Sequence, residues 1–159
     1  MKEIIIKNIT VNDVPYIREC VSLCKPLDLH TPFTYWVIAE YFNKCSFVIN
    51  IDNNIIGFIT SIKTFNNSIF IWQIGIINEY RNKGLSKILI NKVFESAKKE
   101  NIKKIQVSID EKNSNSYNAF LKYAYENGYN MKRVSKLSIS DFLQENFLEE
   151  EIIYEFDLF

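Results

Sequence analysis

The chain has 159 residues, with 19 basic and 19 acidic side chains that give a formal net charge of zero. This length suits one domain over residues 1–159, with enough apolar side chains for a substantial core. A nucleic-acid-binding protein usually carries a basic surplus, so the balanced charge argues against nucleic acid as a partner.

The numbers of cysteines and histidines limit the kinds of site that the chain can form. Three cysteines, Cys20, Cys24 and Cys45, and a single histidine, His30, do not make a plausible zinc site. We therefore expect no metal, and we interpret the cysteines as free thiols in a reducing cytosol. No apolar run reaches membrane-spanning length, and the N-terminus has the pattern of a strand. These features predict a cytoplasmic protein without a membrane partner.

The first third of the chain, after a strand predicted at residues 3–9, carries two helix starts. Thr10 and Asp13 have the spacing of a capping box, and a helix with apolar positions at helical spacing follows. It ends before Pro26. Thr31 followed by Pro32 predicts a second helix, because threonine is a favoured cap and proline a favoured first helical residue. We expect this helix to continue to about residue 44.

The rest of the chain alternates between strands and helices. Asx-rich turns separate strands at residues 46–51, 55–63 and 70–76, which predicts an antiparallel meander. A long amphipathic helix at residues 85–99 then leads to a strand at 104–109, which implies a right-handed parallel crossover. Gly128 is expected to end a fourth helix. After Tyr129 the predictions are an extended segment, a loop with a short helical turn at 135–149, and a closing strand at 151–156.

The segment between the meander and the long helix is the most informative. It has the form Arg-x-x-Gly-x-Ser, with Arg81, Gly84 and Ser86 at the defining positions. A helix start presents unpaired backbone N–H groups and the positive end of the helix dipole, so this one suits an anion such as a pyrophosphate. An ordinary strand–loop–helix turn with a solvated arginine is the alternative.

Arg-x-x-Gly-x-Gly/Ala after a strand is the signature of the GNAT acetyltransferases, and the order of the predicted elements resembles that fold nearly from end to end. The resemblance implies an α/β fold with a mixed central sheet flanked by helices. Three stretches are more narrowly similar to the L-2,4-diaminobutyrate acetyltransferases of ectoine biosynthesis. They cover residues 27–35, beginning with Leu27-Asp28, residues 70–76, which include Trp72-Gln73, and residues 149–154, which begin with three glutamates. The first departs from that family at His30, Thr31 and Phe33, where Asn, Ser and Tyr are common.

The resemblance also implies acetyl-CoA as cofactor. The central strand would diverge from its neighbour, so that its backbone binds the pantetheine arm and one N–H stabilises the developing oxyanion. Two asparagines that open the fourth helix are either cofactor contacts or caps. The expected cofactor-binding residues are Ile74, Gly75, Ile76, Arg81, Asn82, Lys83, Gly84, Leu85, Ser86, Asn113 and Asn118.

The general acid is a departure from many GNATs, which have a tyrosine four residues before the glycine that ends the fourth helix. Here that position is Ala124, flanked by Tyr123 and Tyr125. One residue turns a helical side chain by about 100°, so neither neighbour inherits the role automatically.

A diamino acid carries two ammonium groups and one carboxylate, so a selective pocket needs carboxylates and an aromatic face. Asp28, Trp72 and Glu151 supply these types from three segments, and we expect them to form the catalytic site. The alternatives are a capping aspartate, a core tryptophan and a solvated charge run. The prediction is an N-acetyltransferase acting by direct attack on a small diamino acid. The alternatives are an acetyltransferase for another amine (polyamine, aminoglycoside or peptide) and a non-catalytic acyl-CoA-binding module. A homodimer is an open alternative for the oligomeric state.

Overall fold

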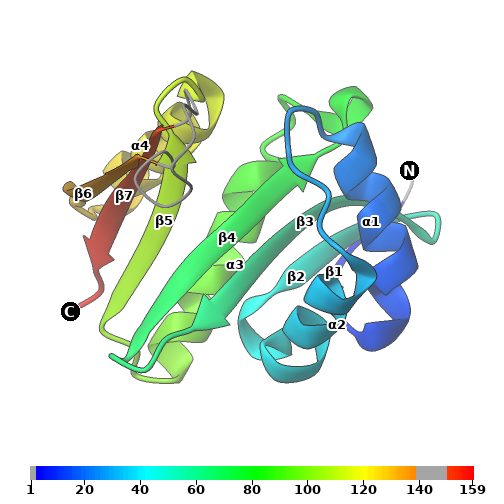
Figure 1. Ribbon diagram of the computed structural model, residues 1–159, viewed down its shortest axis with the longest axis horizontal. Helices are drawn as coiled ribbons and strands as arrows, with labels where there is room; N and C mark the ends of the chain where they lie inside the picture. The colour runs from blue at the N-terminus through cyan, green and yellow to red at the C-terminus, as the bar shows by residue number, and fades with distance from the viewer. Residues whose placement is uncertain (1–2, 139–149) are drawn as a thin grey trace.

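The computed structural model describes residues 3–138 and 150–159. Its strands form one seven-stranded sheet in the order β1-β2-β3-β4-β5-β7-β6 (Figure 1). All neighbouring strands are antiparallel except β4 and β5, which are parallel. The predicted meander and parallel crossover are therefore confirmed. The strands are β1 Ile4–Asn8, β2 Phe47–Ile51, β3 Asn54–Lys63, β4 Ser68–Ile76, β5 Lys104–Asp110, β6 Met131–Ser138 and β7 Glu150–Asp157.

Helices cover both faces of the sheet and enclose two apolar clusters. Figure 1 shows α1 and α2 in front of the sheet and α3 behind it. The α1 and α2 side chains pack on β2 and β3, whereas those of α3 and α4 form the larger cluster on the other face. No helix within residues 3–138 and 150–159 is long and apolar enough to cross a membrane. The helices are α1 Val14–Leu23, α2 Pro32–Tyr41, α3 Leu85–Lys99 and α4 Ser114–Asn127.

The helix signals act locally as the sequence predicts. The Asp13 carboxylate accepts a hydrogen bond from the Thr10 backbone N–H at 2.8 Å, and the Thr31 hydroxyl accepts one from the Thr34 N–H at 3.3 Å. One boundary prediction was wrong, because α2 ends at Tyr41 and a 3-10 turn follows over Asn43–Cys45. That turn tightens the chain before β2 begins.

The prediction of a loop at residues 135–149 was wrong at its beginning. Residues 135–138 continue β6, which pairs with β7 at the edge of the sheet. An edge strand can be polar along its length, so its sequence need not show apolar alternation. Residues 139–149, where the short helical turn was expected, lie outside the described part of the chain.

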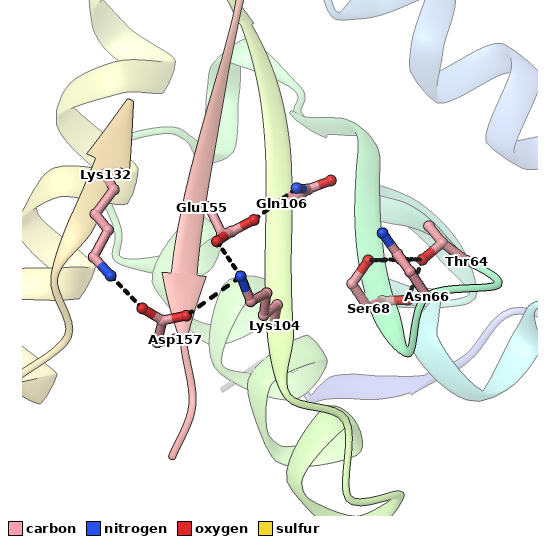
Figure 2. A network of polar contacts seen from close by, with 8 residues as sticks. All are labelled: Thr64, Asn66, Ser68, Lys104, Gln106, Lys132, Glu155 and Asp157. Carbon is pink, nitrogen blue, oxygen red and sulfur yellow. Dashed lines mark hydrogen bonds and ion pairs between the residues drawn. The ribbon is translucent and has the colours of Figure 1, made fainter. Parts of the chain in front are cut away.

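Polar side-chain contacts link β5, β7 and β6 at the end of the sheet where β5 begins. Lys104 on β5 bonds to Glu155 on β7 at 2.7 Å, and Gln106 donates to the same carboxylate at 2.8 Å (Figure 2). Asp157 lies 3.9 Å from Lys104 and pairs with Lys132 on β6. Hydrogen bonding from Lys104 lowers the pKa of Glu155, and hydrogen bonding from Lys132 lowers that of Asp157. These contacts link three strands where β5 begins.

The β3–β4 turn lies at the same end. The Thr64 and Ser68 hydroxyl groups are 2.7 Å apart, and Ser68 donates to the Asn66 side chain at 2.8 Å (Figure 2). The backbone of Asn67 accepts a hydrogen bond from the Lys103 N–H at 3.3 Å, which ties this turn to the start of β5.

At the other end, β4 leaves β5 because it contains a β-bulge. Thr60 of β3 pairs with Gln73, and Ser61 pairs with Ile71, so Trp72 is an extra residue in β4. The pairing of β4 with β5 covers only Ser68 to Ile71 within the described chain, and the two ribbons diverge beyond it (Figure 1). We call residues 72–76 the open edge of β4.

The bulge also changes which β4 side chains face which way. Ile69 and Ile71 belong to the cluster beneath α3, and so do Ile74 and Ile76. In a regular strand only every second residue faces one side of the sheet, so odd-numbered and even-numbered residues cannot both face α3. The bulge therefore shifts this alternation by one residue between positions 71 and 74. As a result Trp72 and the adjacent Gln73 both face the loop between α1 and α2.

Candidate active site

A cavity of about 350 Å³ lies beside the open edge of β4. It is lined by the loop after α1, by β4 and β5, by the start of α4 and by β7. Asp28, Trp72 and Glu151, predicted from three separate segments, all line it, together with Ile74 and Asn113. The cavity therefore combines carboxylates, an aromatic side chain and strand backbone within reach of one small molecule.

The acidic run near the C-terminus is divided by the alternation of β7. Glu150 forms an ion pair with Lys136 of β6, whereas Glu151 lines the cavity and accepts a hydrogen bond from the Ser108 hydroxyl of β5. Glu149 lies outside the described residues. Trp72 is 39% exposed, so it is not a core tryptophan.

Two buried side chains hold the loop that carries Asp28. The Tyr35 hydroxyl of α2 donates to the Gln73 side-chain oxygen at 3.0 Å, and the Gln73 side-chain nitrogen donates to the Asp28 carbonyl at 2.8 Å. Gln73 is 8% exposed and Tyr35 fully buried. Sequence reasoning did not assign these roles. The available signal was a glutamine within an apolar strand, since a buried amide must find partners.

His30 is a second residue that sequence reasoning left without a role. It lines the cavity, and its ring lies 5.3 Å from the Trp72 ring in an edge-on arrangement. Its backbone is fixed on both sides: the N–H donates to the Tyr35 hydroxyl at 3.4 Å, and the carbonyl accepts from Arg18 at 3.3 Å. The only signal in the sequence was that the chain has a single histidine.

The glycine loop has the geometry that an anion site requires. Gly84 precedes α3 with φ of 76°, in the left-handed region, and no atom lies within 4 Å of the position that a Cβ would take. Leu85 is buried in the core, so only its backbone can face a ligand. The Arg81 side chain donates to the Ile76 carbonyl at 2.9 Å and so joins the loop to the end of β4.

The two asparagines predicted on α4 differ in their surroundings. The Asn113 side chain caps α4 by accepting from the Ser116 N–H at 3.1 Å, although it also lines the cavity. Asn118 is exposed on α4 and does not line the cavity. Gly75 allows a close approach, because a Cβ there would lie 2.8 Å from the Phe58 ring and 3.0 Å from the Cys24 sulfur.

The tyrosines beside Ala124 do not point into the cavity. Tyr123 is 3% exposed, and its hydroxyl donates to Asn91 of α3 at 2.9 Å. Burial raises the pKa of its phenol. Tyr125 is 87% exposed, and Ala124 is buried. Over the described residues there is also no group of three histidine, cysteine or acidic side chains that could hold a metal ion.

Comparison with known proteins identifies the family to which the chain belongs. The model of the acetyltransferase (GNAT) family matches residues 15–125, and the chain belongs to this family. The sequence is 26% identical over 127 residues to the L-2,4-diaminobutyric acid acetyltransferase of Marinococcus halophilus, covering 79% of this chain and 70% of that protein. It is 25% identical over 129 residues to the same enzyme of Vibrio parahaemolyticus, covering 80% and 71%.

Solved structures agree with this fold. The diaminobutyrate acetyltransferase EctA from Paenibacillus lautus, solved with L-2,4-diaminobutyric acid and coenzyme A, matches with a TM-score of 0.90 at 20% identity, over 100% of this chain and 98% of that one. An N-acetyltransferase from Staphylococcus aureus matches with a TM-score of 0.73 at 18% identity, over 99% of each chain. The predicted family and fold are confirmed.

The family uses acetyl-CoA, and the residues present fit it. The open edge of β4 offers backbone donors and acceptors that β5 does not take up, which suits an amide-containing pantetheine arm. The open space above Gly84 at the start of a 15-residue helix suits a pyrophosphate.

Proposed function

We propose that this acetyltransferase transfers the acetyl group of acetyl-CoA to one amino group of L-2,4-diaminobutyrate or a closely similar diamino acid. One observation carries the proposal: Asp28, Trp72 and Glu151 line one cavity beside the open edge of β4, although they come from distant parts of the chain. Asp110 adds a third carboxylate to the same cavity. A general amine acetyltransferase needs no such set of carboxylates and an indole.

The donor site in this proposal uses the residues expected from the sequence. The backbone of Ile74, Gly75 and Ile76 would hold the pantetheine arm, with one N–H as oxyanion donor. The loop from Arg81 to Ser86, with Asn82, Lys83, Gly84 and Leu85 between them, would hold the pyrophosphate. When bound, acetyl-CoA supplies the acetyl group as an activated thioester. Asn113, which lines the cavity, and Asn118, which is exposed on α4, both remain proposed cofactor contacts.

The acceptor site pairs opposite charges. Asp28 and Glu151 would each accept hydrogen bonds from an ammonium group, and Trp72 would pack against the cationic end of the acceptor. The hydroxyl of Ser108 orients Glu151, and Gln73 fixes the backbone of Asp28. Holding the amine next to the β4 backbone favours direct attack, because orientation lowers the entropic part of the barrier.

Paired variants test the acceptor assignment. Loss of one charged hydrogen bond in a closed site costs about 1.5–3 kcal/mol, so Asp28→Asn and Glu151→Gln should each lower kcat/KM for diaminobutyrate by about 10- to 100-fold. The KM for acetyl-CoA should stay near wild type. Glu150→Gln is the matched control, because the neighbouring carboxylate pairs with Lys136 and does not line the cavity.

The substrate class is tested by thiol release from acetyl-CoA with a panel of amines that contains diamino acids, polyamines, aminoglycosides and peptides. Preferred turnover of a polyamine, an aminoglycoside or a peptide would contradict the diamino-acid assignment. Coenzyme A binding without turnover of any amine would favour the acyl-CoA-binding module.

We also infer a single domain over residues 1–159 and a cytoplasmic location, and we keep a homodimer as the alternative to a monomer. The buried free thiols of Cys20, Cys24 and Cys45 support a reducing compartment. Light scattering coupled to size-exclusion chromatography tests the dimer, which a monomeric mass at micromolar concentration would contradict.

A further inference from the structure

We propose that His30 recognises the carboxylate of the acceptor and so selects a diamino acid over a plain diamine. This inference rests on the proposed function. Of the three carboxylates that line the cavity, Asp28 and Glu151 account for two ammonium groups, and Asp110 accepts a hydrogen bond from the Lys112 backbone N–H at 2.7 Å. The acceptor also has a carboxylate that needs a donor of its own. His30 is placed to supply that donor.

His30 is the cavity's only side chain that can become a cation. Neither lysine nor arginine lines the cavity within residues 3–138 and 150–159, and the chain has one histidine. Among the other lining side chains, the Ser108 hydroxyl donates to Glu151 and the Gln73 nitrogen donates to the Asp28 carbonyl. The Ser116 hydroxyl and the Asn113 side-chain nitrogen can donate as well, but they are neutral groups that cannot gain a charge. Imidazole provides an N–H in its neutral form and a charged donor when protonated.

The position of His30 is fixed while its ring is left for a ligand. Hydrogen bonds from Arg18 and to Tyr35 hold its backbone to α1 and α2, and Tyr35 is held in turn by Gln73 of β4. Within the described residues, no group makes a hydrogen bond to either ring nitrogen; the ring contacts Trp72 edge-on at 5.3 Å. A donor anchored on three elements can discriminate between ligands that differ by one charged group.

The experiment compares two acceptors that differ only in the carboxylate, L-2,4-diaminobutyrate and 1,3-diaminopropane, for wild type, His30→Leu and His30→Asn. In His30→Leu we expect kcat/KM for diaminobutyrate to fall about 10- to 100-fold, with little change for diaminopropane. His30→Asn should recover part of the loss, because it restores an N–H. Equal losses on both acceptors, as expected of a base or of a structural residue, would overturn the proposal.

A direct measurement on the wild-type protein avoids dependence on a folded variant. The single histidine gives one set of imidazole NMR signals. With coenzyme A present, diaminobutyrate should shift these signals and diaminopropane should shift them much less. Identical responses to the two ligands would refute carboxylate recognition. A wild-type enzyme that turns over neither acceptor but acetylates another amine would instead refute the proposed function.

Discussion

Replacing Gly84 by alanine tests the donor loop, and Gly128 provides a matched control. The two glycines have φ of 76° and 72°, and in both cases no atom lies within 4 Å of the position of an added Cβ. The backbone strain of an alanine is therefore the same, about 1–2 kcal/mol. For a chain of this length that corresponds to a fall in Tm of about 2–8 °C in both variants.

The variants should differ in cofactor affinity. At Gly84 the methyl group projects into the open space at the start of α3, where the pyrophosphate would meet backbone donors. Losing one charge-assisted hydrogen bond of about 1.5–3 kcal/mol would raise the Kd of coenzyme A by about 10- to 100-fold. Gly128 ends α4, so its variant should bind coenzyme A like wild type.

Calorimetric titration with coenzyme A and thermal unfolding of the same samples separate the two effects. Equal Tm losses with an affinity loss confined to Gly84→Ala would support the donor loop. Equal affinities in Gly84→Ala, Gly128→Ala and wild type would refute it, because the shared strain would then be the only consequence of the substitution.

Three further predictions concern the acceptor loop, the end of the sheet where β5 begins and the bulge. Gln73→Met should raise the KM for the acceptor about 10-fold with little effect on the KM for acetyl-CoA, because it removes the hydrogen bond to the Asp28 carbonyl and the one that Tyr35 donates to Gln73. Lys104 lowers the folded-state pKa of Glu155, so this ion pair stabilises the folded protein fully above a pH of about 4–5, and the stabilisation is lost as the pH falls further. Acid unfolding of Lys104→Met should therefore show a weaker pH dependence than that of the wild type. Deletion of Trp72 should abolish coenzyme A binding in a folded protein, whereas Trp72→Leu should retain it; hydrogen exchange would show new protection of amides 73–76 in the deletion variant only.

The features that sequence reveals in this protein are those set within one element. The bounds of α3 follow from its apolar periodicity, and the start of α2 follows from Thr31. Thr10 caps the 3-10 turn Val11–Asp13, which leads directly into α1, because caps act over three or four residues. The acidic run shows the limit. Three glutamates are adjacent in the sequence, but the pairing of β7 with β5 and β6 decides that Glu150 forms an ion pair with Lys136 while Glu151 lines the cavity.

The roles of Gln73 and His30 were beyond sequence reasoning for the same reason. The role of Gln73 depends on contacts with residues 38 and 45 positions away. The role of His30 depends on a loop that other elements hold in place. A glutamine in an apolar strand signals that some partner exists, but only the packing of α2 against β4 identifies Tyr35 as that partner.

The bulge at Trp72 connects the two halves of the site physically. An extra residue in β4 increases the local twist and bends the strand, and here the bend falls where pairing with β5 stops. The same extra residue places Trp72 and Gln73 on one face, so that one contributes its indole to the acceptor cavity while the other holds the Asp28 loop.

Removing residue 72 would restore the regular ladder without reversing residues 73–76, because Thr60 and Gln73 already pair. A straight β4 could then continue its pairing along β5, and the backbone groups proposed to hold the pantetheine arm would be used up within the sheet. A leucine at this position keeps the residue count and hence the bulge, so the two variants separate the indole's contact with the acceptor from the backbone geometry on which the donor site depends.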